Sequence, residues 1–314
     1  MINAILKFKE IVAPEKTRIE HLFPHILVFG GKADAQNTDK YQSCRNVFLE
    51  WAHKTKYELA NCLLTPEDFQ EEWNRIGGYP NLVDFEKEAG CLARGILLFS
   101  ECEGALAELG AFCTDDVLCE RLVVVLEDKH YDDDSPDASS FIRWGPIKRI
   151  EDLHPEKSIC LVSSLKDKHA FENEVGNVGE TLRSKVSTLP ETKKFNSNEI
   201  RDQFLLIADL IELFGALNER ELGNLLEFMK VKPANLSRML NQLILFKLIV
   251  KSKGISGTYY VRPKNGASYL DYTAHADSKF EKVTFRIFST HPELKKETEK
   301  DRLKAYEKIH GVLR

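Results

Sequence analysis

Short apolar runs recur along the first half of the chain, and longer amphipathic segments separate them. An apolar run of about four to eight residues between small or polar residues is typical of a strand covered on both faces. Between the runs, apolar residues follow helical spacing, as Val47, Phe48 and Trp51 do within 44–54. The pattern predicts a Rossmann-like open parallel sheet of the α/β class. The expected strands are residues 26–29, 59–64, 95–99, 122–126 and 159–162.

The stretch Gly95–Phe112 predicts a strand, a tight turn at 100–104 and a helix that begins at Ala105. Glu108 would then lie in the first turn of that helix, where unpaired N–H groups and the helix dipole favour negative charge. We therefore expect an ionised carboxylate just beyond the end of a strand, where open α/β sheets bind ligands. The alternative is a glutamate that only complements the helix dipole.

Other candidate residues follow the neighbouring strands. Gly30-Gly31 could let the backbone pass close to a phosphate or a ribose, and Glu101 or Glu86 could align a sugar hydroxyl or a water. A simple turn and solvated surface charge are the alternatives for these residues. Thr65–Asp68 predicts the start of a short helix that runs to Trp73.

No GxGxxG or GxxxxGK[ST] motif follows any strand, so an ordinary NAD-dependent dehydrogenase or a P-loop protein is not expected. The long polar segment 127–146, which contains Trp144, is of a length that is more often functional or mobile than structural.

The second half of the chain predicts three helices, at 199–214, 219–229 and 234–246, followed by two short strands at 248–251 and 259–262. This order is typical of a winged helix-turn-helix. The expected domains are a front domain at 1–165, a helical connector at 166–198, the winged helix at 199–274 and a helical tail at 275–314.

Charge differs between the two halves. Residues 200–314 contain 20 Lys and Arg against 14 Asp and Glu, whereas residues 1–199 contain 24 against 35. The back of the chain is therefore the expected surface for a nucleic-acid-containing partner, through phosphate contacts. The third helix would expose Asn235, Arg238, Asn241 and Gln242, and the phosphate candidates are Arg238, Lys251, Lys253 and Arg262. A solvated or protein-binding face is the alternative.

Cysteine usage and hydropathy indicate the compartment. The seven cysteines are scattered and form no CxxC pair, so we expect reduced thiols and no metal site. No apolar run approaches the length of a membrane span, and the first residues lack a signal-peptide core. A cytoplasmic chain without membrane contact is therefore predicted.

A family resemblance follows from the motifs and their order. The most specific is Glu-x-x-Gly-x-x-x-Glu-Leu-Gly-Ala-Phe, with Glu101, Gly104 and Glu108 at its fixed positions. Gly30-Gly31, Pro66-Glu67-Asp68 and the Phe-Ile-x-aromatic-Gly-Pro run that contains Trp144 support it. Over nearly its whole length the chain resembles effectors of bacterial retrons that join a nucleoside deoxyribosyltransferase-like domain to a winged helix.

The resemblance implies an activity, a site and a partner. The front domain would hydrolyse the N-glycosidic bond of NAD, a substrate here and not a cofactor, with Glu108 as the catalytic carboxylate. Gly30, Gly31, Glu67, Asp68, Glu86, Glu101, Gly104 and Trp144 are the expected substrate-binding residues. The back domain would dock on the retron reverse transcriptase and its DNA–RNA hybrid (msDNA), in a higher-order assembly that restrains the toxin until phage attack.

Two departures from related deoxyribosyltransferases concern the sugar and base preference. Arg94-Gly95 replaces an acidic residue often found before the central strand, and Glu103 stands where a proline or glycine-rich turn is usual.

Two other functions stay open from the sequence. One is a nucleoside or nucleotide N-glycosidase or deoxyribosyltransferase. The other is a non-enzymatic, nucleotide-sensing DNA-binding regulator.

Overall fold

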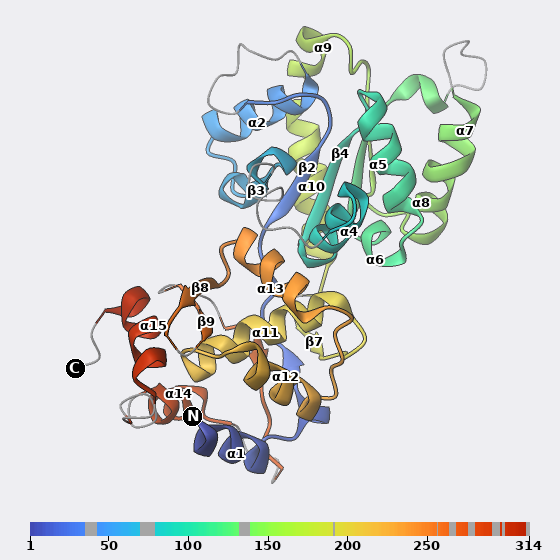
Figure 1. Ribbon diagram of the computed structural model, residues 1–314. Coiled ribbons are helices and arrows are strands. Elements are labelled where there is room, and N and C mark those ends of the chain that lie inside the picture. The colour runs from blue at the N-terminus through green and yellow to red at the C-terminus, as the bar shows by residue number, and fades with distance from the viewer. Residues whose placement is uncertain are drawn as a thin grey trace. The chain divides into compact units, whose positions relative to one another are not determined.

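The structure is a computed structural model (Figure 1) that describes residues 1–34, 43–69, 79–131, 139–190, 192–255, 257–263, 268–275, 280–290, 296 and 299–311. The chain forms two compact units. A sheet-bearing unit comprises Pro24–Glu71 and Pro80–Pro190, and a helical unit comprises Met1–Phe23, Glu72–Tyr79 and Glu191–Arg314. Among the described helices, none combines the length and the apolarity needed to cross a bilayer.

The sheet-bearing unit contains a parallel five-stranded sheet of order β3-β2-β4-β5-β6. The chain moves outward to one edge from β2 to β3 and then returns to place β4 on the other side of β2. This reversal between β2 and β4 is the topological switch point at which open α/β sheets bind ligands. The strands are β2 (Ile26–Phe29), β3 (Leu63–Leu64), β4 (Gly95–Phe99), β5 (Leu122–Glu127) and β6 (Ile159–Val162).

The mixed α/β class and the parallel sheet, consistent with a Rossmann-like core, are confirmed. The strand expected at 59–64 is shorter than predicted, because Ala60–Cys62 forms a 3-10 turn, η2, and only Leu63 and Leu64 pair with β2. The short helix expected after it is a 3-10 turn, η3 (Pro66–Phe69), and its predicted continuation to Trp73 lies outside the described residues.

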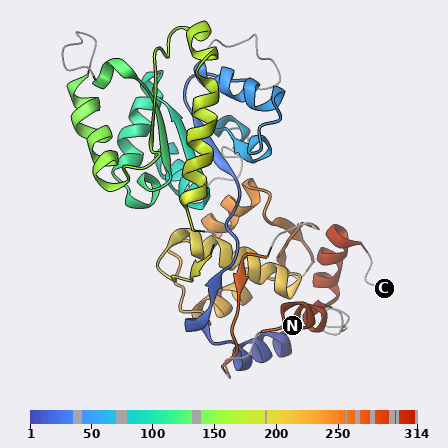
Figure 2. The same cartoon turned by 180° about the vertical axis from the view of Figure 1, so that it is seen from behind.

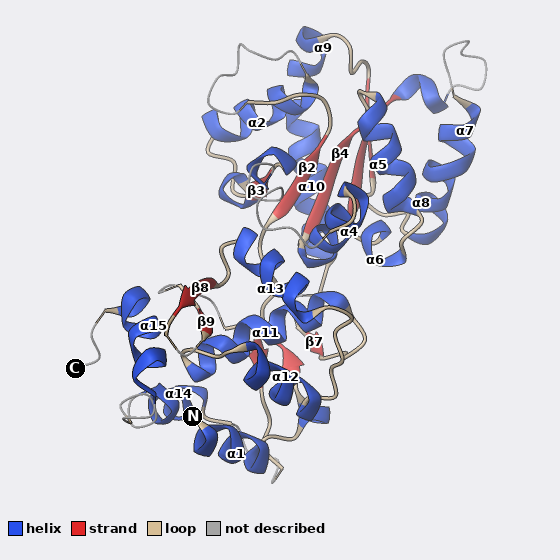
Figure 3. Ribbon diagram, in the orientation of Figure 1, coloured by secondary structure: helices blue, strands red, loops and turns tan. Residues whose placement is uncertain are grey.

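Helices cover both faces of this sheet (Figures 1 and 3). One face packs against α2 (Cys44–Lys54) and α10 (Val175–Thr188). In the reverse view of Figure 2, α10 lies in front of the sheet. The other face packs against α4 (Leu82–Leu92) and α5 (Glu103–Cys113). The shorter elements are α6 (Asp116–Cys119), η4 (Asp128–Tyr131), α7 (Ser140–Ile142), the π-helical η5 (Arg143–Ile147), α8 (Lys148–Leu153) and α9 (Lys168–Glu172).

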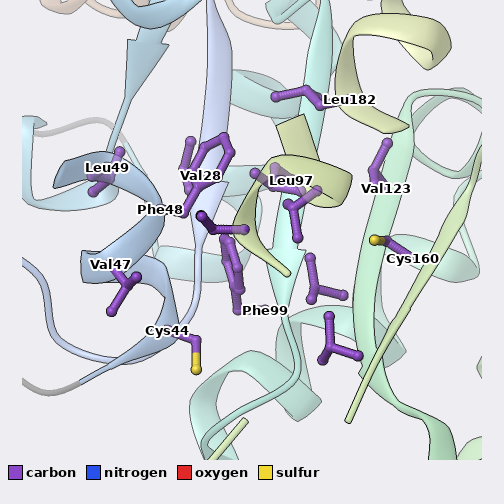
Figure 4. Packing of buried hydrophobic residues seen from close by; sticks show 14 of the residues in the cluster. Val28, Cys44, Val47, Phe48, Leu49, Leu97, Phe99, Val123, Cys160 and Leu182 are labelled. Carbon is purple, nitrogen blue, oxygen red and sulfur yellow. The ribbon is translucent and has the colours of Figure 1, made fainter. Parts of the chain in front are cut away.

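The core between the sheet, α2 and α10 is built from alternate strand positions (Figure 4). Val28, Leu97 and Val123 point to this face, as the two-residue period of a strand requires. Phe48 of α2 lies 5.8 Å from Phe99 of β4, ring centre to ring centre, and both rings are fully buried. The connector predicted at 166–198 is divided between the two units. Its residues up to Pro190, which include α9 and α10, belong to the sheet-bearing unit, and the rest belong to the helical unit.

The helical unit contains the predicted three helices and hairpin. They are α11 (Ile200–Phe214), α12 (Glu219–Phe228), α13 (Leu236–Leu245) and the antiparallel pair β8 (Val250–Lys253) and β9 (Thr258–Val261). Asn218 and Glu221 form the predicted capping box of α12. The three helices and the hairpin are confirmed, but α13 begins two residues later than predicted and β8 is shifted by two residues from the predicted 248–251. Their classification as a winged helix stays a prediction.

The helical unit also contains elements that we did not predict. They are α1 (Ile2–Ile11), η1 (Pro14–Lys16) and an antiparallel sheet of β10 (Leu270–Asp271), β1 (Arg18–Ile19) and β7 (Lys193–Lys194). The helical tail predicted at 275–314 contains two described helices, α14 (Lys282–Thr290) and α15 (Lys300–His310). Phe8 of α1 is fully buried, with ring centres 5.4–6.0 Å away in Phe214, Phe228, Tyr272, Phe280 and Phe285.

Two glycines of α10 give a matched test of its packing. A Cβ on Gly179 would lie 2.5 Å from the Trp51 ring, which packs at a tilt against Phe48 and Tyr57. A Cβ on Gly176 would meet nothing within 4 Å among the described residues. We expect Gly179→Ala to lower the free energy of unfolding by about 1–3 kcal/mol. Gly176→Ala, as the control, should leave it unchanged or raise it by up to about 1 kcal/mol. Urea denaturation measures both, and equal values would contradict the packing.

Candidate active site

The helix after the central strand begins earlier than predicted. Cys102 is the N-cap of α5, with extended backbone, and Glu103 takes the acidic first-turn position. Glu108 is therefore in the second turn, away from the unpaired N–H groups, and our prediction of a first-turn, ionised carboxylate is wrong. Burial instead raises the pKa of Glu108 to about 7, opposed by the charge of Arg45 and increased by that of Glu67. Near neutral pH, Glu108 is thus divided between its acid and its carboxylate form.

Arg45 links the Pro-Glu-Asp motif to α2 and β2. It is 2% exposed, donates to both carboxylate oxygens of Glu67 and donates at 3.2 Å to the carbonyl oxygen of Val28 in β2. Glu67 belongs to η3, so the Pro-Glu-Asp motif after β3 is tied to the start of α2. A buried guanidinium of this kind supplies fixed positive charge, and at Glu108 it favours the ionised form.

Glu86 is more buried than Glu67 and Glu108. It is 6% exposed on α4, and burial, followed by the negative charges of Glu108 and Glu67, raises its pKa to about 8. Glu86 is consequently protonated at neutral pH, while Glu108 is about half ionised. Two interacting carboxyl groups whose pKa values are raised to different extents, to about 7 and about 8, can divide the base and acid roles of glycoside cleavage between them.

One carboxylate oxygen of Glu108, Oε2, is buried without a hydrogen-bond partner among the described residues. Burying a carboxylate oxygen without a hydrogen-bond partner costs free energy of folding, so such an atom is a candidate contact for a ligand. Arg45, Glu67, Glu86 and Glu108, from α2, η3, α4 and α5, are the candidate active site.

Glu101 holds the backbone of this site. Its Oε1 accepts from the amide N–H of Gly31 at 2.8 Å and of Arg45 at 3.1 Å, and its Oε2 accepts from that of Cys44 at 2.6 Å. Burial raises the pKa of Glu101, and the three hydrogen bonds oppose that rise. The prediction that Glu101 aligns a substrate hydroxyl or water is untested, and its contacts here are with the backbone.

The two glycines after β2 make room for that carboxylate. Gly30 has a φ of +149°, and a Cβ there would lie 2.9 Å from Glu101 Oε1 and from the Cβ of Phe99. A Cβ on Gly31 would lie 2.8 Å from the Cβ of Ser43 and 3.1 Å from the same Oε1. In this structure the two glycines therefore make room for Glu101 and for neighbouring side chains, and an approach to a phosphate or ribose stays a prediction.

The other predicted substrate residues lie in more open positions. Asp68 accepts from the backbone N–H of Thr65 at 2.7 Å, which is a turn-capping contact. Gly104 is exposed in the first turn of α5, and a Cβ there would meet nothing within 4 Å among the described residues. Trp144 of η5 is 59% exposed, with the Arg143 guanidinium 5.1 Å from its ring centre. No cluster of metal-ligating residues occurs in the searched, described part of the chain.

The phosphate candidates of the helical unit differ in exposure. Lys251 and Lys253 are exposed, and alternate positions of β8 place them on one face. Arg238 is partly exposed, 5.1 Å from the ring centre of Tyr79. The prediction that Arg262 contacts phosphate is wrong. Its side chain is 2% exposed and packs 4.9 Å from the Tyr269 ring centre, so it does not face an outside phosphate. Gln242, expected on the exposed face of α13, is fully buried.

Comparison with known proteins gives the class. Residues 41–251 match the model of the STM3845 retron effector protein family, and the chain belongs to that family. The matched range contains Arg45, Glu67, Glu86, Glu101 and Glu108. A relative in Escherichia coli, named "Retron Ec86 putative ribosyltransferase/DNA-binding protein", is 25% identical over 234 residues, which cover 70% of this chain and 74% of that protein.

The buried acid of α4 gives a pH-dependent stability test. A carboxyl whose pKa rises on folding destabilises the protein as pH increases from its ordinary value of 4.5 towards about 8, because the folded state retains the proton. Gln cannot ionise, so we expect Glu86→Gln to gain about 1–3 kcal/mol of unfolding free energy relative to wild type between about pH 5 and pH 8.5. Denaturant titrations at both pH values measure this gain. Glu103→Gln, on an exposed residue of α5, should show no such change.

Proposed function

We propose that the chain is the toxic effector of a retron and that it cleaves an N-glycosidic bond, with NAD as the substrate and Glu108 as the catalytic carboxylate. The observation that carries this proposal is the buried, unpartnered Oε2 of Glu108 beside the fixed charge of Arg45. The E. coli relative, whose name includes ribosyltransferase, supports glycosyl transfer as the class of chemistry.

The chemistry requires a carboxylate beneath the anomeric carbon. As the bond from ribose to base breaks, positive charge develops on the sugar, and a carboxylate either stabilises that charge or forms a covalent bond to the sugar. Water then takes the place of the base. Arg45 favours the ionised form of Glu108, and Glu101 keeps the amide groups of α2 in place around the same centre.

The second candidate substrate is a nucleoside or nucleotide, and Glu86 favours it. Nicotinamide leaves NAD as a neutral molecule from a positively charged ring, so its departure needs no proton. A purine leaves as an anion unless an acid protonates it. Glu86, protonated at neutral pH next to Glu108, is an acid available for that step.

The helical unit is proposed to dock on the retron reverse transcriptase and its DNA–RNA hybrid, within a cytoplasmic assembly that restrains the enzyme. The net charge of +6 over residues 200–314, against −11 over residues 1–199, supports a nucleic-acid-containing partner for this unit. Of the predicted phosphate contacts, Lys251 and Lys253 are exposed and Arg238 is partly so. The word DNA-binding in the relative's name agrees with this assignment.

A charge-removing substitution tests the catalytic residue. Glu108→Gln keeps the side-chain shape but cannot form a carboxylate, so we expect NAD hydrolysis to fall by about 10³-fold or more with little loss of stability. Glu120→Gln, the same change on an exposed residue of the sheet-bearing unit, should retain wild-type rates. Released nicotinamide is measured with purified protein. Full activity of Glu108→Gln rejects the site, and binding of NAD or nucleosides without release of base indicates a sensor.

The pH dependence of the rate separates the two substrates. NAD cleavage needs only ionised Glu108, so its rate should rise with pH around 7 and then stay level. Nucleoside cleavage also needs protonated Glu86, so its rate should fall again above about 8. Glu86→Gln should abolish that fall and slow nucleoside cleavage by about 10²-fold or more, while NAD cleavage continues. A bell-shaped profile for NAD itself would contradict the assigned roles.

A further inference from the structure

A pocket of about 290 Å³ lies within the helical unit, between the β8–β9 turn and α15. The candidate active site does not include it, and of the predicted phosphate contacts only Lys253 lines it. The turn contributes Lys253, Gly254 and Ile255, and α15 contributes Asp301, Lys304 and Lys308. The helix α15 was expected only to be an exposed tail, so the pocket gives that segment a role.

The pocket is positively charged. Three lysines face one aspartate in its lining, and Lys253, Lys304 and Lys308 are all exposed or partly exposed. Within the described ranges, none of these three ammonium groups has a hydrogen-bond or ion-pair partner. Lys304 and Lys308 are four residues apart, which places their side chains on one face of α15. Unpaired lysines that share a concave surface attract anions.

A buried arginine fixes one wall of the pocket. Arg302 is 3% exposed and donates to Glu221 at 2.8 Å, to Glu299 at 2.7 Å and to the carbonyl oxygen of Ala216 at 2.6 Å. Its guanidinium also lies 5.0 Å from the ring centre of Tyr259 in β9. These contacts hold the backbone of α15 against α12 and the hairpin.

The turn forms the other wall. A Cβ on Gly254 would lie 3.3 Å from the Cβ of Asp301, so the turn backbone comes close to α15. The amide N–H of Gly254 donates to the carbonyl oxygen of Gly257 at 2.8 Å, which closes the turn. The pocket is thus largely formed in advance, which lowers the entropic cost of binding.

We propose that this pocket binds the phosphodiester backbone of a nucleic acid. Lys251 lies on the same face of β8 as Lys253, so the basic surface continues along the strand beyond the pocket. Ile255 is 95% exposed beside the lysines and offers an apolar contact for a sugar or base edge, which a free inorganic anion would not use. The inference rests on the proposed nucleic-acid-containing partner and adds α15 to the surface that binds it.

Charge reversal of the two α15 lysines tests the proposal. The full chain carrying Lys304→Glu and Lys308→Glu is titrated with a fluorescent single-stranded DNA and with a DNA–RNA hybrid of equal length, at several salt concentrations. We expect affinity to fall about tenfold or more, and the slope of log affinity against log salt to decrease by roughly 1.5, for two lost phosphate contacts. Changing both lysines to Gln should give a smaller loss in the same direction.

The control is a reversal of equal charge elsewhere. Lys166→Glu with Lys168→Glu changes two lysines of the sheet-bearing unit and should leave binding and its salt slope unchanged. NAD hydrolysis by the α15 variant, with Glu108 intact, should equal that of wild type, so a failure of the catalytic proposal would be visible separately.

Each other outcome overturns the proposal. If wild type binds nucleic acid and the α15 reversals match the control, the partner surface lies elsewhere and the pocket is not part of it. If inorganic phosphate competes fully at low concentration, the pocket is a small-anion site. If wild type binds neither probe at low salt, the nucleic-acid partner and this pocket are both rejected, whatever the hydrolysis rate.

Discussion

The candidate active site depends on one half-buried carboxylate, that of Glu101. With two oxygens it accepts three backbone N–H groups, one from the turn after β2 and two from the first turn of α2. Hydrogen bonds from N–H groups to a charged acceptor are the stronger kind, and helix N-termini favour negative charge. The carboxylate therefore joins the ends of the two strands that flank the switch point, and it sets where Arg45 leaves the backbone.

The position of Arg45 then determines the electrostatics around it. Its guanidinium is turned towards Glu67 and favours ionisation of Glu108, whereas Glu86 lies deeper in apolar surroundings and keeps its proton. Two glutamates of identical chemistry, Glu86 and Glu108, thus acquire different pKa values from burial and neighbouring charge alone. Such a division of roles is what acid–base chemistry at neutral pH requires.

Local pattern was sufficient for much of the fold. The strands at 26–29, 95–99 and 159–162 and the helix Cys44–Lys54 have the predicted bounds, because each depends on its own apolar spacing and caps. Helix α1 was not recognised, since its apolar face is explained only by partners such as Phe285, far away in the sequence. Arg45 was missed for the same reason, because no local motif marks an arginine of α2 that pairs with Glu67 in η3.

The protonation state of Glu108 shows a different limit of sequence analysis. Its role as the catalytic carboxylate stays a prediction, but a two-residue error in the start of α5 led to the opposite direction of its pKa shift. Helix starts are uncertain by that amount from sequence alone. Burial, which dominates the shift, depends on segments such as α4 that no local window contains.

The order of segments along the chain has a consequence for synthesis. Residues 24–190, apart from a short excursion, form the sheet-bearing unit, whereas the helical unit combines the first 23 residues with those after 190. The amino group of Met1 pairs with Glu299 at 3.0 Å, across almost the entire length of the chain. On the ribosome, the sheet-bearing unit has all its strands once residue 190 has emerged, but the helical unit must wait for the last helix. The segment that bears the candidate active site is therefore complete before the unit proposed to restrain it.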